Sequence, residues 1–257
     1  MNNSIKKLLD KKVEQYNQPF FIKDDPLSIP HRFAKKQDIE IAGFFAAILA
    51  WGNRKSIINS CENLLVRMDN APHDFCLHHS AKEAKNLLAF KHRTFKDTDL
   101  LCLINFFKNH YAKNRSLETA FTKGMGPGDT TVENALIGFH NYVFTNNADF
   151  EERTRKHIAS PAKKSACKRL NMFLRWMVRN DNKGVDFGIW KNIQPAQLIC
   201  PIDVHVSRVA KRLNILHRKQ TDWQAALELT GYLRTLDPAD PVKYDFALFG
   251  LGVVEHY

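Results

Sequence analysis

Apolar residues recur every three or four positions along most of the chain, and this period is typical of amphipathic helices. Alternating, β-branched patterns bounded by hairpin turns, which are typical of strands, are absent from the sequence. The pattern therefore predicts an all-α fold. The expected helices span 4–18, 37–51, 55–69, 97–113, 116–123, 130–145, 161–180, 203–214, 221–236 and 241–254.

Short breaks rich in Pro, Gly, Asn and Asp separate these helices, for example at 124–129 and 180–184. Breaks of this length are too short to be flexible linkers between independent domains. We therefore expect one domain, 1–257, made of tightly packed lobes of roughly 36–150 and 151–257 plus an N-terminal helix.

The composition is that of a folded protein with a basic surface. Hydrophobic residues make up 44% of the 257, which argues against disorder. Lys and Arg number 38 against 27 Asp and Glu, which gives a formal net charge of +11. A surplus of this size favours a polyanionic partner, most simply nucleic acid bound with a steep salt dependence.

Several features bear on location and cofactors. The longest apolar run, 41–51, is too short to cross a bilayer, and the first residues lack the apolar core of a signal peptide. The five cysteines show no CxxC or other close spacing, which is typical of a reducing compartment. The His78-His79 pair lacks partners at metal-ligand spacing. We expect a cytoplasmic monomer without metal, cofactor or membrane association.

The segment 160–180 predicts a basic helix. Ser160 suits the N-cap and Pro161 the first helical position. Lysines in a first turn oppose the helix dipole, but together with exposed amides they suit a bound phosphate. A solvated cationic face is the alternative interpretation. The cations of this segment are Lys163, Lys164, Lys168, Arg175 and Arg179, and all but Lys163 share one face at spacings of four, seven and four.

A single acidic residue, Asp203, lies where the turn after Pro201 enters the next basic helix. An Asp at this position can cap the helix by accepting from the unpaired amides of its first turn. It can also project into a cleft beside bound nucleic acid. The sequence leaves both roles open.

Two resemblances extend this interpretation. The stretch 40–51 resembles the early core helix of the helix-hairpin-helix DNA glycosylase superfamily, and Lys168 together with 201–209 resembles its catalytic segment. The sequences of 165–176 and 240–250 resemble a bacterial family, that of domain of unknown function 2400, more closely than they resemble the glycosylases. The resemblance to this family covers most of the chain.

The glycosylase resemblance implies two interlocked helical lobes around a central cleft that receives a flipped-out nucleotide. Lys168 would attack the sugar carbon of the damaged nucleotide, and the neighbouring cations Lys164 and Arg169 favour its neutral amine. Asp203 would stabilise the positive charge that develops on the sugar, or accept a proton from the amine. If Lys168 only contacts phosphate, Asp203 would direct a water, and strand cleavage would not follow.

The resemblance also implies contacts to nucleic acid from Trp51, Asn53, Arg54 and Lys55, which follow the early core helix, and from His205. Core packing is the alternative for Trp51. The chain departs from the superfamily at 158–162, where its Leu-Pro-Gly-x-Gly hairpin is missing. It also separates Lys168 from Asp203 by 35 positions, and lacks the cysteines of an iron–sulfur cluster.

Two functions follow from the sequence. The first is a DNA base-excision repair glycosylase, with AP-lyase activity if Lys168 is the nucleophile. The alternative is a non-catalytic nucleic-acid-binding protein on the same scaffold. DNA is the expected partner in both, and RNA stays open.

Overall fold

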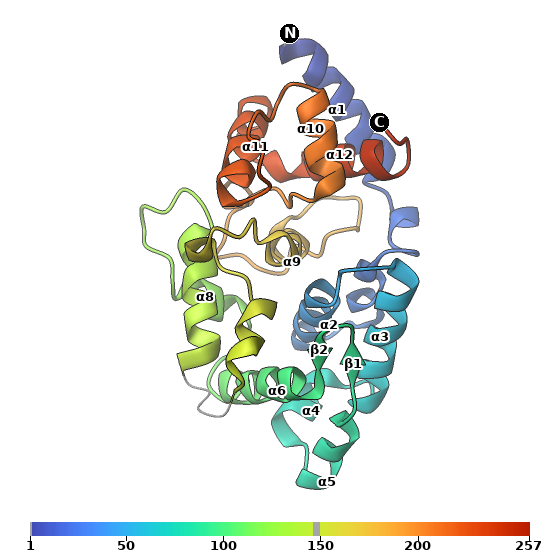
Figure 1. Cartoon of the computed structure of the whole chain (residues 1–257), viewed down its shortest axis with the longest axis vertical. Helices are drawn as coiled ribbons and strands as arrows, with labels where there is room; N and C mark the ends of the chain where they lie inside the picture. Colours follow the sequence, from blue (N-terminus) through green and yellow to red (C-terminus); the bar gives the residue numbers. More distant parts are fainter. Residues whose placement is uncertain (1, 146–149) are drawn as a thin grey trace. The chain divides into compact units, whose positions relative to one another are not determined.

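The computed structural model describes residues 2–145 and 150–257, and helices dominate them (Figure 1). The prediction of an all-α fold is confirmed in this coarse form. The helices are α1 (Asn2–Tyr16), α2 (Lys36–Ile48), α3 (Arg54–Arg67), α4 (Pro72–His78), α5 (Ala81–Ala84), α6 (Asp97–Tyr111), α7 (Glu118–Thr122), α8 (Glu133–Thr145), α9 (Lys168–Val178), α10 (Val204–Arg212), α11 (Trp223–Leu236) and α12 (Tyr244–Val253).

The described residues also include one short antiparallel hairpin. It consists of β1 (Lys91–His92) and β2 (Phe95–Lys96), joined by a turn in which Arg93 has a left-handed φ of 57°. Two-residue strands are too short to show an alternating pattern in the sequence.

The described chain divides into two compact units. The terminal unit contains the residues up to Ile22, Gly126–Asn134 and Ser160–Tyr257, and the internal unit contains Lys23–Met125 and Ala135–Ala159. The two units alternate along the chain, because Gly126–Asn134 belongs to the terminal unit although the segments on either side of it belong to the internal unit. The expected lobes of 36–150 and 151–257 plus the N-terminal helix stay a prediction.

Phenylalanines form the centre of the internal unit. Phe139 of α8 stacks on Phe121 with ring centroids 3.9 Å apart, and meets Phe44 of α2 and Phe106 of α6 edge-on at 5.7 and 5.8 Å. Every residue of α2 from Ile39 to Ile48 is buried. The long apolar run in the sequence is thus the central helix of this unit.

In the terminal unit, α1 and α10 both pack against α12 (Figure 1). The approach of α1 to α12 depends on Gly250, because a Cβ there would overlap the ring of Tyr16. The side chains of Phe246, Leu248 and Leu251 on α12 are buried. The unit thus closes on the C-terminal helix.

All five cysteines are free and buried. Cys61, Cys76 and Cys102 belong to the internal unit, and Cys167 and Cys200 to the terminal unit. Burial raises the pKa of Cys61 and of Cys167 to about 12. Among the residues described, none of the helices combines the length and the hydropathy that a membrane crossing requires.

Candidate functional site

Lys168 and Asp203 meet in the terminal unit at the beginnings of two helices. Lys168 is the first residue of α9, and Asp203 is the N-cap of α10. The Nζ atom of Lys168 lies 3.2 Å from Oδ2 of Asp203. The side chains are 33% and 15% exposed, so the pair is open to solvent on one side. The fold thus joins two residues that are far apart in sequence.

The two carboxylate oxygens of Asp203 have different partners. Oδ1 accepts from the backbone N–H groups of His205 and Val206, both at 2.9 Å, whereas Oδ2 faces Lys168. The predicted cap is confirmed. Because the cap fixes the carboxylate, its second oxygen is held toward the lysine amine.

The helix that carries Lys168 begins later than predicted. Pro161–Lys163 form a single 3₁₀ turn, η6, and Lys164 ends this turn with a left-handed φ of 59°. Cys167 is also left-handed, with φ 50°, and α9 starts directly after it. The Ser160 side chain makes no cap hydrogen bond, so the predicted helix start at this residue is wrong.

Contacts with the beginning of α11 explain this turn. Ser165 forms an antiparallel β-bridge with Asp222, and the N–H of Trp223 donates to the carbonyl of Lys164 at 3.3 Å. These backbone bonds take the segment away from helical geometry, although its residues suit a helix.

The turn places the two early lysines off the lysine helix. Lys163 and Lys164 are exposed, but neither belongs to α9. The prediction that Lys164 lies one helical turn before Lys168 is therefore wrong. A left-handed backbone conformation costs a residue other than glycine about 1–2 kcal/mol. The glycines of the superfamily hairpin are missing here, so the chain makes this sharp turn with residues for which the conformation is unfavourable.

Arg175 is a second correction. We expected it on a cationic surface, but it is buried, with 5% of its surface exposed. Its Nε lies 3.2 Å from Oδ1 of Asp186, and its Nη1 pairs with the carboxylate of Asp245. A buried guanidinium requires such partners, because an unpaired charge in the interior is costly. Arg175 is thus held inside the unit and does not present its charge to a surface phosphate.

Arg179, one turn later, is buried in the same way. It completes a network of two arginines and four carboxylates inside the terminal unit. Its partners are Asp181, Asp186 and Asp240. One feature of the sequence accompanies this network but does not identify it. The arginines flank the apolar run 176–178, and a cation on the buried side of a helix needs buried carboxylates.

Asp245 connects this network with the candidate pair. Burial raises the pKa of its carboxyl to about 6, against the opposing charge of Arg175. The negative charge of Asp203 raises this pKa further, whereas the positive charge of Lys168 lowers it. The buried carboxyl therefore responds electrostatically to both members of the pair.

His205 lies in the first turn of α10 and is half-buried. Its Nδ1 atom is buried and has no hydrogen-bond partner among the described residues. Its Cβ lies close to α12, since a Cβ added at Gly252 would be 3.1 Å away from it. The expected contact between His205 and a phosphate stays a prediction.

The residues after the early core helix belong to the internal unit. Trp51 is half-buried, with the guanidinium of Arg93 5.0 Å from its ring centroid. Asn53 is the N-cap of α3, where its Oδ1 accepts from the N–H of Ser56 at 3.3 Å. Arg54 and Lys55 form the exposed first turn of α3. Their contacts with nucleic acid stay predictions.

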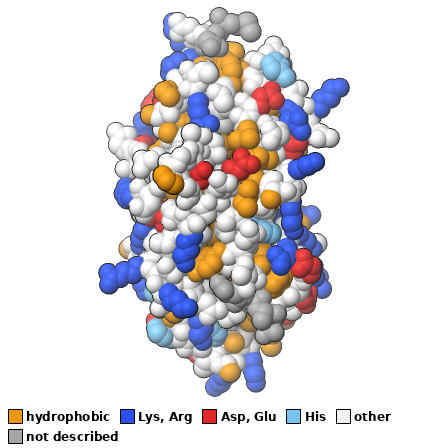
Figure 2. All heavy atoms as spheres, turned by 90° about the vertical axis from the view of Figure 1, so that its left-hand side faces the viewer, with side chains coloured by type: hydrophobic (Ala, Val, Ile, Leu, Met, Phe, Trp, Pro, Cys, Tyr) orange, Lys and Arg blue, Asp and Glu red, His pale blue; other side chains and the backbone are white. Residues whose placement is uncertain are grey.

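The surface charge does not by itself locate a site. On the face shown in Figure 2, the Lys and Arg side chains are scattered and do not form a single patch. Within the described ranges, no group of three or more His, Cys, Asp and Glu residues has an arrangement suited to a metal ion. The Lys168–Asp203 pair is therefore identified by its geometry.

The comparisons with known proteins give one match. A family model described as Protein of unknown function (DUF2400) matches residues 25–254. The matched region includes α2 to α12 and both members of the candidate pair. The comparison with curated proteins and the comparison with solved structures found no match.

Proposed function

The chain belongs to the DUF2400 family, and we propose that this member is a DNA base-excision glycosylase that acts on a flipped-out damaged base. The single observation that carries the proposal is the ion pair of Lys168 and Asp203, with 3.2 Å between Nζ and Oδ2. An amine beside a carboxylate, both partly open to solvent, is the arrangement that covalent attack with proton transfer requires.

In the proposed reaction, a proton leaves the ammonium of Lys168 for Oδ2 of Asp203 or for solvent. The lone pair of the resulting amine then forms a bond to C1′ of the extruded nucleotide. The bond from C1′ to the base breaks, and its electron pair leaves with the base, which is protonated by water. Asp203 offsets the positive charge that develops on the sugar. The nitrogen at C1′ then loses a proton, the C1′–O4′ bond breaks, and O4′ takes the electron pair and a proton, which opens the sugar ring and leaves a protonated imine between Lys168 and C1′. Loss of a proton from C2′ and departure of the 3′-phosphate then cleave the strand by β-elimination.

The proposal includes the two-lobed, helix-hairpin-helix glycosylase-like fold. Two observations support it: the tight turn from Pro161 to Cys167 directly before the lysine helix, and the aspartate cap of the following helix. The turn lacks glycine, and this favours the alternative, a non-catalytic nucleic-acid-binding protein. The chemistry of Lys168 distinguishes the two.

Borohydride trapping on a panel of lesion-containing oligonucleotides tests the proposal. We expect the wild type to form a covalent adduct with at least one lesion, and Lys168→Gln to form none. The control is Lys164→Gln, which removes an exposed lysine of the preceding turn and leaves α9 unchanged. It should trap like the wild type.

Two other results would contradict the proposal. If both variants trap as well as the wild type, Lys168 is not the nucleophile. If the wild type excises no lesion and traps on none, the protein is the non-catalytic binder. Base release without trapping would instead indicate that Asp203 directs a water, and the glycosylase would be monofunctional.

A further inference from the structure

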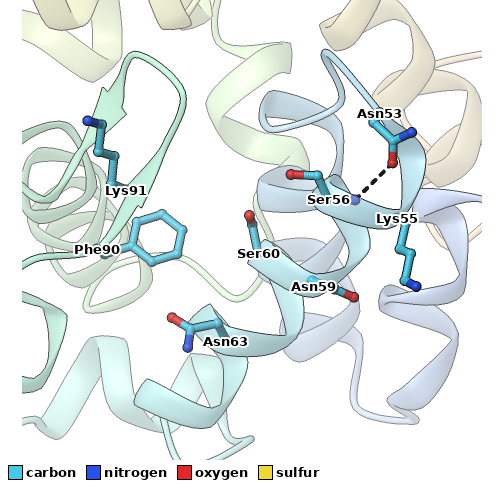
Figure 3. A pocket seen from close by; sticks show the side chains of 8 residues that line it. All are labelled: Asn53, Lys55, Ser56, Asn59, Ser60, Asn63, Phe90 and Lys91. Carbon is cyan, nitrogen blue, oxygen red and sulfur yellow. Dashed lines mark hydrogen bonds between the residues drawn. The ribbon is translucent and has the colours of Figure 1, made fainter.

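A polar groove follows one face of α3 in the internal unit. Neither Lys168 nor Asp203 lines it. The groove is shallow and open to solvent, with a volume of about 430 Å³, and Figure 3 shows the Phe90 ring facing Ser60 across it. None of the residues that line it is acidic, although the chain has 27 Asp and Glu. The lining residues are Asn53, Lys55, Ser56, Asn59, Ser60, Asn63, Phe90 and Lys91.

The α3 face of this groove is made of short polar side chains. Ser56, Asn59, Ser60 and Asn63 succeed one another at helical spacing, so they share neighbouring positions on the helix surface. Asn and Ser are weak helix formers, because their side chains compete for backbone hydrogen bonds. Helix stability therefore does not explain why four of them follow one another on the solvent side of α3.

The hydrogen bonds inside the groove leave donors available. Oδ1 of Asn53 accepts from the N–H of Ser56, and Oδ1 of Asn63 accepts from Nε of Arg67 at 2.7 Å. Both partners can only donate, so they fix the orientation of each amide. The amide oxygens are thus occupied, and the Nδ2 groups of Asn53 and Asn63 are left to donate to a ligand.

Two lysines add positive charge to these donors. Lys55 lies in the first turn of α3, and Lys91 lies on β1 of the hairpin. Both are exposed, and neither forms an ion pair within the described part of the chain. Donors and cations in a groove that no acidic residue lines favour a ligand that is anionic and rich in acceptor oxygens.

The hairpin gives the groove a fixed wall. Phe90 precedes β1 and is buried, with 3% of its surface exposed. The hydroxyl of Ser60 and Nδ1 of His92 on β1 are hydrogen-bonded at 2.9 Å, which connects α3 directly with the hairpin. Lys91 is consequently held opposite α3, without a free loop between them.

The length of the groove distinguishes between candidate anions. From Asn53 to Asn63 the helix rises about 15 Å, which is longer than a single phosphate group. Amide, hydroxyl and ammonium donors along such a path are typical of contacts to the phosphates and sugars of a nucleic-acid strand.

We infer that the α3 groove binds the phosphodiester backbone of a nucleic-acid strand, with Lys55 and Lys91 on phosphates and Asn59 and Asn63 on phosphate or sugar oxygens. The inference rests on the proposed function in one respect, that nucleic acid is the ligand. It adds a second contact surface, in the internal unit, which holds the strand without taking part in the reaction.

The test is fluorescence anisotropy of the full chain with labelled single-stranded and duplex oligonucleotides. The double variant Lys55→Gln/Lys91→Gln should bind about tenfold more weakly, and the slope of log K against log salt should fall by about 1.8 for duplex. Asn59→Asp, which places a carboxylate in the groove, should weaken binding by a similar factor.

The matched control is Lys82→Gln/Lys113→Gln, which removes the same charge from exposed positions of the internal unit. It should weaken binding by less than about threefold. An equal loss in the control would overturn the inference, because net charge alone would then explain binding. Displacement of the oligonucleotide by millimolar inorganic phosphate would also overturn it, because the groove would then bind free anions.

Borohydride trapping on the same variants separates this inference from the proposed function. Groove variants should still trap at saturating protein concentration, because Lys168 is intact. If no lesion traps with the wild type, the proposed glycosylase activity is contradicted. Weaker binding in the groove variants would still support the inference in that case. Wild-type affinity in the groove variants overturns the inference, whether or not trapping succeeds.

Discussion

At the residue scale, the two oxygens of Asp203 separate stability from chemistry. Asp203→Asn keeps an oxygen for the N–H groups of His205 and Val206, since Asn caps helices as well as Asp does. It loses the negative charge beside Lys168. We expect the free energy of unfolding to fall by less than about 1 kcal/mol, whereas base excision should be abolished. Urea unfolding and trapping on the same sample measure both.

Asp222→Asn is a close control for this change. Asp222 caps α11 through the N–H of Ala225 and pairs with Arg218, as Asp203 caps α10 and pairs with Lys168. This variant should lose a similar amount of stability and keep full activity. Equal loss of activity in both variants would show that the effect of Asp203→Asn is structural.

The buried carboxyl of Asp245 predicts a dependence of stability on pH. Burial raises its pKa from the usual 3.8 to about 6, against the charge of Arg175. The folded state therefore binds a proton more tightly than the unfolded state. Stability from this group is complete below about pH 4 and is lost as the pH rises through about 6, by about 2–3 kcal/mol.

Asp245→Asn removes this contribution. In urea unfolding at several pH values, the excess stability of the wild type over the variant should be largest near pH 4 and smallest above pH 7. The absolute stability of the variant also reflects the lost partner of Arg175, so the prediction concerns the change with pH. Parallel curves for the two proteins would contradict it.

The sequence identifies some residues of the candidate site but not the environment of others. Lys168 and Asp203 could be selected, because a resemblance and a cap position indicated them. Arg175 could not be placed, because a cation at helical spacing looks the same on a solvated face as in a buried ion network. Only the positions of Asp186 and Asp245 in space decide between the two.

At the element scale, the turn before α9 is the clearest departure from local preference. The pattern predicts a helix over 161–180, whereas α9 spans Lys168–Val178. Local signals at Ser160 and Pro161 favour a helix start, but the bridge between Ser165 and Asp222 prevails. That bridge joins residues 57 positions apart, so a local pattern cannot reveal it.

The left-handed residue in this turn predicts the effect of a glycine. Lys164→Gly should raise the free energy of unfolding by about 0.5–1 kcal/mol, because glycine adopts φ 59° without steric cost. Lys163→Gly is the matched control, because it removes the same charge one position earlier, where φ is not positive. It should lower stability, and equal effects in urea unfolding would contradict the argument.

At the scale of the whole molecule, the helical class and most helix positions follow from the hydrophobic period. The division into two units does not, because each unit combines segments that are far apart in sequence, such as Gly126–Asn134 with Ser160–Tyr257. The groove on α3 was also missed, apart from Asn53 and Lys55, because its wall comes from a hairpin too short to leave a pattern.

The buried cysteines have a practical consequence for following how the molecule opens. The thiolate is the reactive form, and burial holds these groups as thiols, so an alkylating reagent should modify few of them in the native state. Alkylation of each thiol then shows when the structure around that cysteine has opened.

Pulsed alkylation along a urea series, with peptide mass spectrometry, should show Cys61, Cys76 and Cys102 gaining the label together, and Cys167 and Cys200 together. Cys61 alkylated well before Cys102 would mean that the internal unit does not open as a whole. The native cysteines, at least two in each unit, can therefore report the unfolding of each unit without any engineered probe.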